Sequence, residues 1–319
     1  FPYTTLFRST FLLGTDLLGR DMLSMILAGA QQTFVLVALV VLGRISAGFI
    51  VGALSGWLNG RWFDRVVMGW VDVLASFPAL LIAMVIILAL DIRRGIYPFI
   101  FALTFVGWGE ITQYVRAEVM RIKSMAFIES AIASGSSTLR ILSRHIQPNL
   151  VPALISLTAL EMGAVLMILG ELGFVGIFIG GGIFAELEWM APLFHYSDVP
   201  EWGALLGNLR TYARGYPWMA IYPSIAFFIA ILAFNLFGEG LRTLVDRVGV
   251  RATRWLNRYT LAGFVIFILS MISIKGSTGT MASYRKQAEH FDGANVSASI
   301  EALTLGILDS RALGTTGMR

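Results

Sequence analysis

Two ionisable residues stand inside long apolar runs of this chain. Arg44 lies near the middle of the run at 33–57, and Glu161 lies near the middle of the run at 149–175. A charge at the centre of a bilayer costs about 2.5–3.5 kcal/mol, so two charges at similar depth indicate an ion pair. Such a pair would be either a contact in a translocation path or gate, or a structural link between helices. We prefer the structural link, because buried pairs often do no more than fix the register of their neighbours.

The other ionisable residues show no arrangement typical of catalysis or metal binding. No set of them resembles a catalytic triad or a dimetal cage, and the sequence has no GxxxxGK[ST] loop to hold nucleotide phosphates. Asp16 and Asp21 flank Arg20, which favours a local ion-pair cap at the start of a helix over a metal site. We therefore predict no catalytic residues, no metal site and no cofactor bound by this chain.

A polar segment rich in cations, at 126–149, separates two of the apolar runs. Its pattern predicts two short helices with a break between them. Ser124 is placed to cap the first helix, and Gly135 follows its last turn, where a left-handed C-cap favours glycine. One of the two serines after Gly135 is placed to cap the second helix, and Pro148 should end it.

The elements that position these residues are membrane spans, as the composition indicates. Hydrophobic residues make up 56% of the 319 residues, charged residues only 14%, and the mean hydropathy is +0.74. A soluble domain carries about 25% charged residues, so the chain must sit in lipid. The absence of cysteine excludes a disulfide framework and a thiolate metal site.

Six apolar runs are candidate spans. They lie at 33–57, 65–91, 97–117, 149–175, 217–240 and 259–274. Most have about the 20 residues that a bilayer requires, although the last is short. Pro78 either kinks the second run or divides it into two shorter helices. The predicted fold is therefore an all-α, polytopic bundle of transmembrane helices.

The cations between the runs indicate the orientation of this bundle. Loops that share one side contain the larger set: Arg61, Arg65, Arg116, Arg121, Lys123, Arg140, Arg144, Arg242, Arg247, Arg251, Arg254 and Arg258. Loops on the other side contain Arg93, Arg94, Arg210 and Arg214. The richer side should be cytoplasmic, so the first run leads from outside to inside. Cations grouped in loops rather than in one stripe also argue against nucleic-acid binding.

Several short motifs, taken in order, resemble those of one family of membrane proteins. The external segment before the first run reads GTDxxGRD, with Gly14, Thr15, Asp16, Gly19, Arg20 and Asp21. The polar segment has an EAA-like box with Glu129, Ser130, Ala131 and Gly135. Further matches are Asp72, Pro78, Glu171, the PEWG group Glu201, Trp202 and Gly203, and Asn235 in the final FNLFGEGLR stretch. Together, over about residues 12–246, they are similar to permease subunits of bacterial ABC importers for dipeptides, oligopeptides or nickel, of the type called DppC or OppC.

The resemblance implies a function and a set of partners. It implies a helix bundle of the type I ABC importer kind in the inner membrane, which forms the pore for peptides or nickel-type complexes. Its coupling residues would be Glu129, Ser130, Ala131, Gly135, Arg140 and Arg144. The partners would be a second permease subunit, two ATPase subunits that use the ATP, an external solute-binding protein and the lipid bilayer. Ser130 departs from the family pattern, in which an alanine stands at that place.

The predicted domain organisation follows from these matches. We expect a scar or unstructured segment at 1–11, a permease domain at 12–246 without its first helix, and a basic cytoplasmic linker at 247–258. An extra transmembrane helix at 259–274 and the truncated start of an external domain or stalk at 275–319 would follow.

Two alternative functions remain from the sequence. The last residues resemble the SR..GT.G entry of secreted M28-type metallopeptidases, through Ser310, Arg311, Gly314, Thr315, Thr316 and Gly317. The chain would then be a membrane-anchored hydrolase whose catalytic domain lies beyond residue 319. The second alternative is an ion-coupled secondary transporter that uses Arg44 and Glu161.

Overall fold

The computed structural model describes residues 11–17, 19–185, 194–197, 200–207, 209 and 213–248. All of them belong to the first of the two units into which the chain divides, residues 1–265. The predictions for the N-terminal segment before residue 11 and for everything after residue 248 lie outside the described residues. These include most of the basic linker, the extra helix at 259–274, and the external tail.

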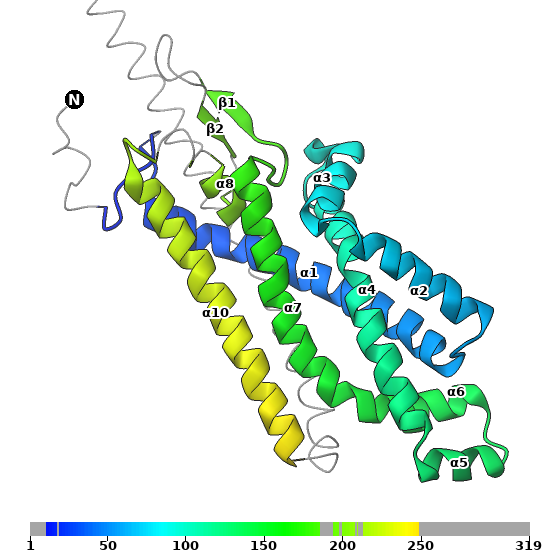
Figure 1. Cartoon of the computed structure of the whole chain (residues 1–319). Helices are drawn as coiled ribbons and strands as arrows, with labels where there is room; N and C mark the ends of the chain where they lie inside the picture. Colours follow the sequence, from blue (N-terminus) through cyan, green and yellow to red (C-terminus); the bar gives the residue numbers. More distant parts are fainter. Residues whose placement is uncertain are drawn as a thin grey trace, which may run out of the picture. The chain divides into compact units, whose positions relative to one another are not determined.

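Long helices account for most of the described chain, as the sequence predicts. They are α1 (Met22–Trp57), α2 (Trp62–Ala75), α3 (Ala79–Ala89), α4 (Ile96–Lys123), α7 (Gln147–Val175) and α10 (Pro217–Val248). Among the described residues, three helices are long and apolar enough to cross a membrane, and a fourth span exists if the bent pair α2 and α3 is one span. The predicted transmembrane helix bundle is therefore confirmed (Figure 1).

The second predicted run is divided rather than straight. Helices α2 and α3 meet at an angle of 95° across a short break that ends in Pro78. Pro78 has no N–H to donate, and in the middle of a helix its ring would collide with the preceding turn. It therefore stands just before α3, where neither penalty arises.

Helix α1 begins earlier than its hydropathy indicates, at Met22. Its packing on α4 depends on Gly48, Gly52 and Gly56, which are spaced four residues apart and so share one face. A Cβ atom added at these glycines would lie 2.4, 2.7 and 2.8 Å, respectively, from atoms of α4. Small residues at this spacing let two helices approach closely in a membrane.

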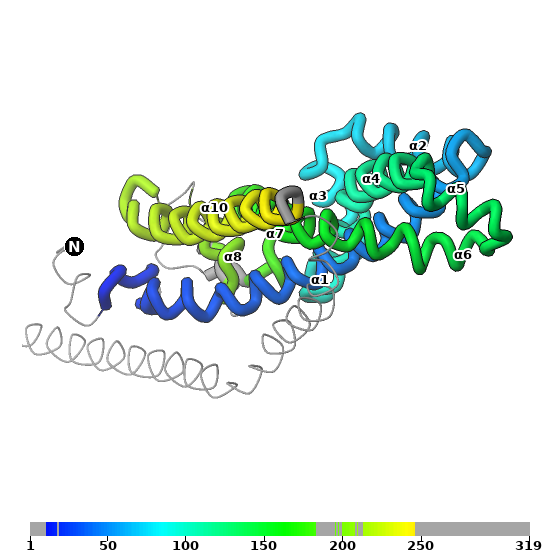
Figure 2. The backbone as a smooth tube through the Cα atoms, turned by 90° about the horizontal axis from the view of Figure 1, so that it is seen from below, coloured from blue at the N-terminus to red at the C-terminus, as the bar shows by residue number. Residues whose placement is uncertain are grey.

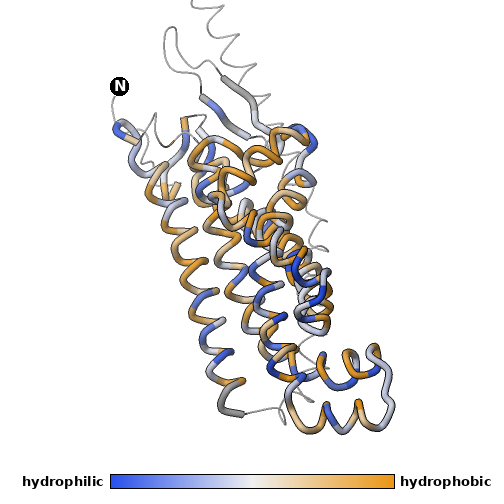
Figure 3. Tube along the Cα trace, turned by 45° about the vertical axis from the view of Figure 1, so that its right-hand side comes forward, coloured by the Kyte–Doolittle hydropathy of each residue, from blue (hydrophilic) through white to orange (hydrophobic). Residues whose placement is uncertain are grey.

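The bundle has two different ends. At the first, which we call the loop end (residues 57–62 and 116–146), lie α5 (Ala126–Ala133), α6 (Thr138–Ile141) and a π turn over Leu142–Ile146. Figures 1 and 2 show α5 and α6 beyond the end of α4. Between the two ends, apolar residues predominate along the long helices (Figure 3).

At the other end, which we call the hairpin end (the described residues of 11–21 and 176–216), lie two short strands and a short helix. Strand β1 (Ile183–Ala185) pairs antiparallel with β2 (Phe194–Tyr196), and α8 is Trp202–Leu206. A 3-10 turn over Ile92–Arg94 links α3 and α4. The all-α prediction did not include this hairpin, whose intervening residues 186–193 are outside the described part.

The buried apolar residues form two clusters. The larger cluster lies toward the hairpin end and includes Leu36, Val40, Phe99, Leu166 and Trp202. The smaller cluster lies toward the loop end and joins α4 to the segment that follows it, through Val115, Val119, Ile122, Ile128, Ile141, Ile146 and Leu150. The loop end is thus held to the bundle mainly by its own apolar core.

Candidate functional site

The first short helix of the loop end, α5, ends as the sequence predicts. Gly135 has φ +74°, in the left-handed region that favours glycine. The N–H of Ser136 donates to the Ala131 carbonyl (3.1 Å) and the N–H of Gly135 donates to that of Ile132 (2.9 Å). These two bonds form a Schellman motif, which satisfies carbonyls that the helix end leaves without partners.

The start of α5 differs from the prediction. Met125, not Ser124, is its N-cap residue, and no side chain caps the helix. The Ser124 hydroxyl instead donates to the Arg121 carbonyl (2.9 Å). The prediction was wrong because Ser124 still belongs to the end of α4, where free carbonyls compete for its hydroxyl.

The second short helix does not stop at Pro148. Ser137 is the N-cap residue of α6, without a capping bond from its side chain, and the π turn then leads directly into α7. Residues Thr138–Val175 form one continuous helical span. Pro148 lies in the first turn of α7, where its missing N–H costs little, and the wider π turn precedes it. The predicted end at Pro148 was therefore wrong.

The loop end presents its predicted coupling residues on an open surface. Glu129, Ser130, Gly135, Arg140 and Arg144 are exposed, and Ala131 is half-buried. Within the described residues, no ion pair joins Glu129 to Arg140 or Arg144, so these charges are open to a partner. Three large apolar side chains, Phe127, Ile132 and Leu139, are also 44–76% exposed there. A surface that combines apolar side chains with both signs of charge suits a protein partner.

The two charges inside the bundle lie together. Arg44 Nη1 of α1 is 2.9 Å from Glu161 Oε2 of α7, and both side chains are nearly inaccessible, at 3% and 6% exposure. Arg44 Nε also donates to the Leu103 carbonyl of α4 (2.8 Å). One guanidinium therefore links three helices. Arg44 Nη2 has no hydrogen-bond partner among the described residues.

Gly107 makes room for this guanidinium. A Cβ atom added at Gly107 would lie 2.1 Å from Arg44 Cζ. Because only glycine leaves the Leu103 carbonyl accessible from that side, the three-helix contact requires Gly107 as well as the charged pair. The sequence offered no signal for this requirement, since a glycine in a helix has many explanations.

The GTDxxGRD motif forms the start of α1. Arg20 Nε is 2.7 Å from Asp16 Oδ2, and the Asp21 carboxylate caps α1 by accepting from the N–H groups of Leu23 and Ser24. These contacts agree with the predicted ion-pair cap. Gly14 and Gly19 take positive φ values, and the Thr15 carbonyl accepts from the Trp218 indole (2.9 Å). Among the described residues, no group of three or more His, Cys, Asp or Glu lies together.

The PEWG motif forms a buried junction at the hairpin end. Trp202 Nε1 donates to the Ile26 carbonyl of α1 (2.7 Å), and its ring packs edge-on against Phe34 and Phe227. The Gly203 carbonyl lies so close to Gly173 of α7 that a Cβ there would be 2.5 Å away. The motif thus joins α1, α7 and α10.

Glu201 of this motif is buried. Its Oε1 accepts from the Ile179 N–H (2.6 Å). Burial raises the pKa of Glu201 to about 8, although the Ile179 N–H acts in the opposite direction. The carboxyl group is thus held in its neutral form over most of the physiological pH range.

The remaining predicted residues do not join these sites. Asp72 and Pro78 are exposed on α2 and at its bend, and Glu171 is half-buried near the end of α7. Asn235 is exposed on α10, but its amide lies against Gly163 of α7, where an added Cβ would be 2.9 Å from Asn235 Oδ1. Asn235 thus lies at the contact between α10 and α7.

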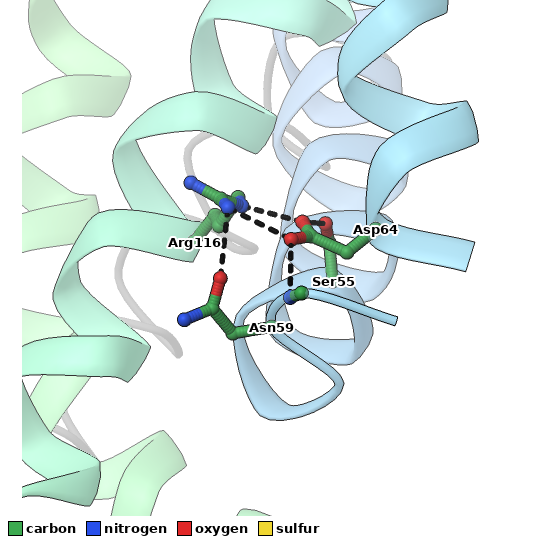
Figure 4. A network of polar contacts seen from close by, with 5 residues as sticks. Ser55, Asn59, Asp64 and Arg116 are labelled. Carbon is green, nitrogen blue, oxygen red and sulfur yellow. Dashed lines mark hydrogen bonds and ion pairs between the residues drawn. The ribbon is translucent and has the colours of Figure 1, made fainter. Parts of the chain in front are cut away.

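One polar cluster was missed by the sequence analysis. Asp64, at the start of α2, is buried and binds Arg116 of α4 with both carboxylate oxygens, at 2.5 and 2.8 Å (Figure 4). The carboxylate also accepts from the Ser55 hydroxyl and from the Gly60 N–H. The available signal in the sequence was an acidic residue in the first turn of a helix. Such a residue indicates a favourable interaction with the helix dipole, and it does not indicate a partner 52 residues away.

Comparison with known proteins identifies the family. The family described as "binding-protein-dependent transport system inner membrane component" matches residues 48–248. The chain belongs to this family. It is 32% identical over 234 residues to the glutathione transport system permease protein GsiD of Pectobacterium atrosepticum, which covers 73% of this chain and 71% of that protein. It is 30% identical over 235 residues to the probable D,D-dipeptide transport system permease protein DdpC of Escherichia coli K12, with 73% and 72% covered.

A solved structure supports the fold of this permease. The permease matches a chain in the inward-facing conformations of the MetNI methionine ABC transporter with a TM-score of 0.54. The two are 18% identical, and the match covers 73% of the permease and 97% of that chain. The fold of the type I ABC importer permease is therefore shown.

Family membership also decides between the functions that the sequence left open. The protein is a permease subunit of an ABC importer in the inner membrane, and the family implies ATPase and substrate-binding partners. The membrane-anchored metallopeptidase and the secondary transporter are set aside.

Proposed function

We propose that this permease subunit carries short peptides across the inner membrane. The relatives named above are a glutathione and a D,D-dipeptide permease, and both names refer to short peptides. We further propose that the permease pairs with a second permease subunit and two ATPase subunits, and receives its substrate from an external binding protein.

The observation that carries the coupling part of this proposal is the surface of the loop end. The buried side chains Ile128, Ile141 and Ile146 hold α5 and α6 to α4, while Glu129 and Arg140 face outward. A rigidly attached surface with unpaired charges and exposed apolar side chains suits docking of the ATPase subunits. The coupling residues would be Glu129, Ser130, Ala131, Gly135, Arg140 and Arg144.

On this proposal the permease itself is not an enzyme. The described residues hold no group of three or more metal-ligating side chains, and the sequence has no phosphate-binding loop. The ATPase subunits would use the ATP, and this chain would bind no cofactor. Its own contribution would be mechanical, because movement of α5 and α6 reaches α4 through the shared apolar cluster.

The Arg44–Glu161 pair would act as a fixed joint within that movement. It ties α1, α4 and α7 at one point in the bundle. A joint of this kind keeps three helices in register while their ends move. We therefore assign it a structural role in transport rather than contact with the peptide.

The proposal is tested with the assembled transporter in proteoliposomes, with glutathione and D-alanyl-D-alanine as probes. Glu129→Lys and Gly135→Arg should leave the permease in the membrane but uncouple ATP hydrolysis from uptake. Ser143→Ala, an exposed change in the same loop end, is the matched control. Normal uptake by both variants would contradict the coupling role, and uptake of neither probe by the unaltered transporter would contradict the peptide class.

A further inference from the structure

The Asp64 carboxylate, at the start of α2, binds three separate segments of the chain at once. Ser55 belongs to α1, the Gly60 N–H belongs to the turn between α1 and α2 (2.9 Å), and Arg116 belongs to α4. The Asp64 side chain is only 3% exposed. Figure 4 shows these groups converging on the carboxylate, so that both of its oxygens have partners.

Arg116 extends the contact to the turn itself. Its Nη2 donates both to Asp64 Oδ2 (2.8 Å) and to Asn59 Oδ1 (3.0 Å). About two helical turns further along α4, Lys123 Nζ donates to the Trp57 carbonyl (2.8 Å) and lies 4.9 Å from the centre of the Trp57 ring. The α1–α2 turn is therefore bound to α4 at two levels, about two helical turns apart.

The same end of α4 carries the proposed docking surface. Lys123 is the last residue of α4, and α5 begins at Ala126. Ile122 of α4 shares one buried cluster with Ile128, Ile141 and Ile146 of the loop end. Apolar contacts thus join α5 and α6 to α4, and polar contacts join α4 to the start of α2.

We propose that Asp64 and Arg116 are positioning residues for energy coupling. They make α5, α6, the end of α4 and the start of α2 move as one rigid body when the ATPase subunits move the docked loop. The change in backbone conformation during this movement would then occur at the break before Pro78, where α2 and α3 meet at 95°. This inference rests on the proposed docking role of the loop end.

The geometry demands arginine at position 116 and not merely a positive charge. A guanidinium reaches both carboxylate oxygens and the Asn59 amide from one rigid plane, whereas an ammonium is a point charge on a flexible stem. Arg121 offers a matched control on the same helix. It pairs with Glu118 of α4 itself and is 59% exposed, and within the described part of the chain it pairs with no second helix.

The test measures distances between spin labels in the assembled transporter. This chain has no cysteine, so two introduced cysteines are the only labelling sites it contributes, and the partner subunits are used in cysteine-free form. Labels at exposed Arg65 of α2 and Ser143 of the loop end report on the rigid body, and labels at Arg65 and Val85 report across the bend. We expect trapping with ATP and vanadate to leave the 65–143 distance unchanged and to shift the 65–85 distance. A nucleotide-dependent change in the 65–143 distance would overturn the proposal.

The second part of the test uses variants of the polar cluster around Asp64. Arg116→Lys and the milder Asn59→Ala should broaden the 65–143 distance distribution and reduce ATP hydrolysis stimulated by the binding protein by roughly twofold to thirtyfold. Arg121→Lys should do neither. If Arg116→Lys lowers the yield of folded complex, Asn59→Ala, which keeps the Asp64 pair, decides the outcome.

The two proposals fail in different ways. An unaltered permease that binds no ATPase subunit would refute the docking role of the loop end. A permease that assembles and couples, but whose Arg116→Lys and Asn59→Ala variants match Arg121→Lys in both measurements, would refute only the role of Asp64 and Arg116.

Discussion

Arg44 and Glu161 are charged residues inside a helix bundle that lipid surrounds. Their pairing shows how the bundle accommodates the two charges. Two nitrogens of the guanidinium are paired, one with a carboxylate and one with a backbone carbonyl, and Gly107 leaves the space for it. The sequence was sufficient to suggest the pair, because charges in apolar runs are few and two of them lay at similar depth. It could not reveal the Leu103 carbonyl, since every residue has one.

Removing one member of this pair should destabilise the permease more than removing both. Arg44→Leu or Glu161→Leu alone leaves a buried charge without its partner, which costs roughly 3–5 kcal/mol. The double variant removes both charges and should recover part of that loss. A double-mutant cycle on unfolding in detergent measures the coupling, and effects that simply add would show that the two side chains do not interact in the folded permease.

Glu201 should make the stability of the permease depend on pH. Its pKa rises from the ordinary 4.5 to about 8 in the folded protein, because it is buried. The contribution of Glu201 to the free energy of unfolding should be fully present below pH 4.5. It should decline as pH rises toward about 8, since only the unfolded chain loses the proton in that window. The decline is up to about 5 kcal/mol, at 1.36 kcal/mol per pKa unit.

Thermal unfolding in detergent across this pH window measures the effect. Glu201→Gln keeps an oxygen that can accept from the Ile179 N–H and should flatten the decline. Glu129→Gln changes an exposed carboxylate and should leave the decline in place. An equally steep decline in Glu201→Gln would assign the pH dependence to another group.

At the scale of elements, local chemistry was readable from the sequence and distant contacts were not. The Gly135 cap and the break at Pro78 follow from backbone requirements of glycine and proline, which act within a few residues. The continuation of α6 through Pro148 was missed, because a π turn depends on how the loop end packs against α4. The Asp64–Arg116 pair was missed for the same reason, as it bridges two helices.

Helix α1 should tolerate no larger side chain on its glycine face. Gly52→Leu places a side chain where an added Cβ already lies 2.7 Å from the Thr112 carbonyl oxygen of α4. We expect the two helices to separate, with a loss of stability of about 1–3 kcal/mol or more from overpacking. Gly69→Leu on α2 is the control, because nothing lies within 4 Å of its added Cβ. Equal thermal stability of the two variants would contradict the close packing of α1 on α4.

At the scale of the whole permease, the described surface suits a membrane and a partner subunit. Large apolar side chains are exposed along α2, α3 and α10 and at the break between α2 and α3, including Trp70, Phe77, Val85, Phe228 and Phe237. Only 17% of the most apolar window of α10 is buried within this chain. Composition alone predicted a lipid-embedded bundle, because the charge content is too low for a soluble surface. Which of these faces would meet the proposed second permease subunit depends on the shape of that subunit, and this sequence does not encode it.

The orientation of the permease follows from charge and can be tested at both ends. The loop end carries more arginine and lysine than the hairpin end, and cation-rich ends face the cytoplasm. A reporter fused near Ser137 should therefore be cytoplasmic, and one fused near Ser197 should be external. Ser137 precedes α6 at the loop end and Ser197 follows β2 at the hairpin end, so the two fusions sample opposite ends of α7. The reverse result at both sites would place α5 and α6 outside, where no ATPase subunit could dock, and would overturn both the orientation and the coupling role of the loop end.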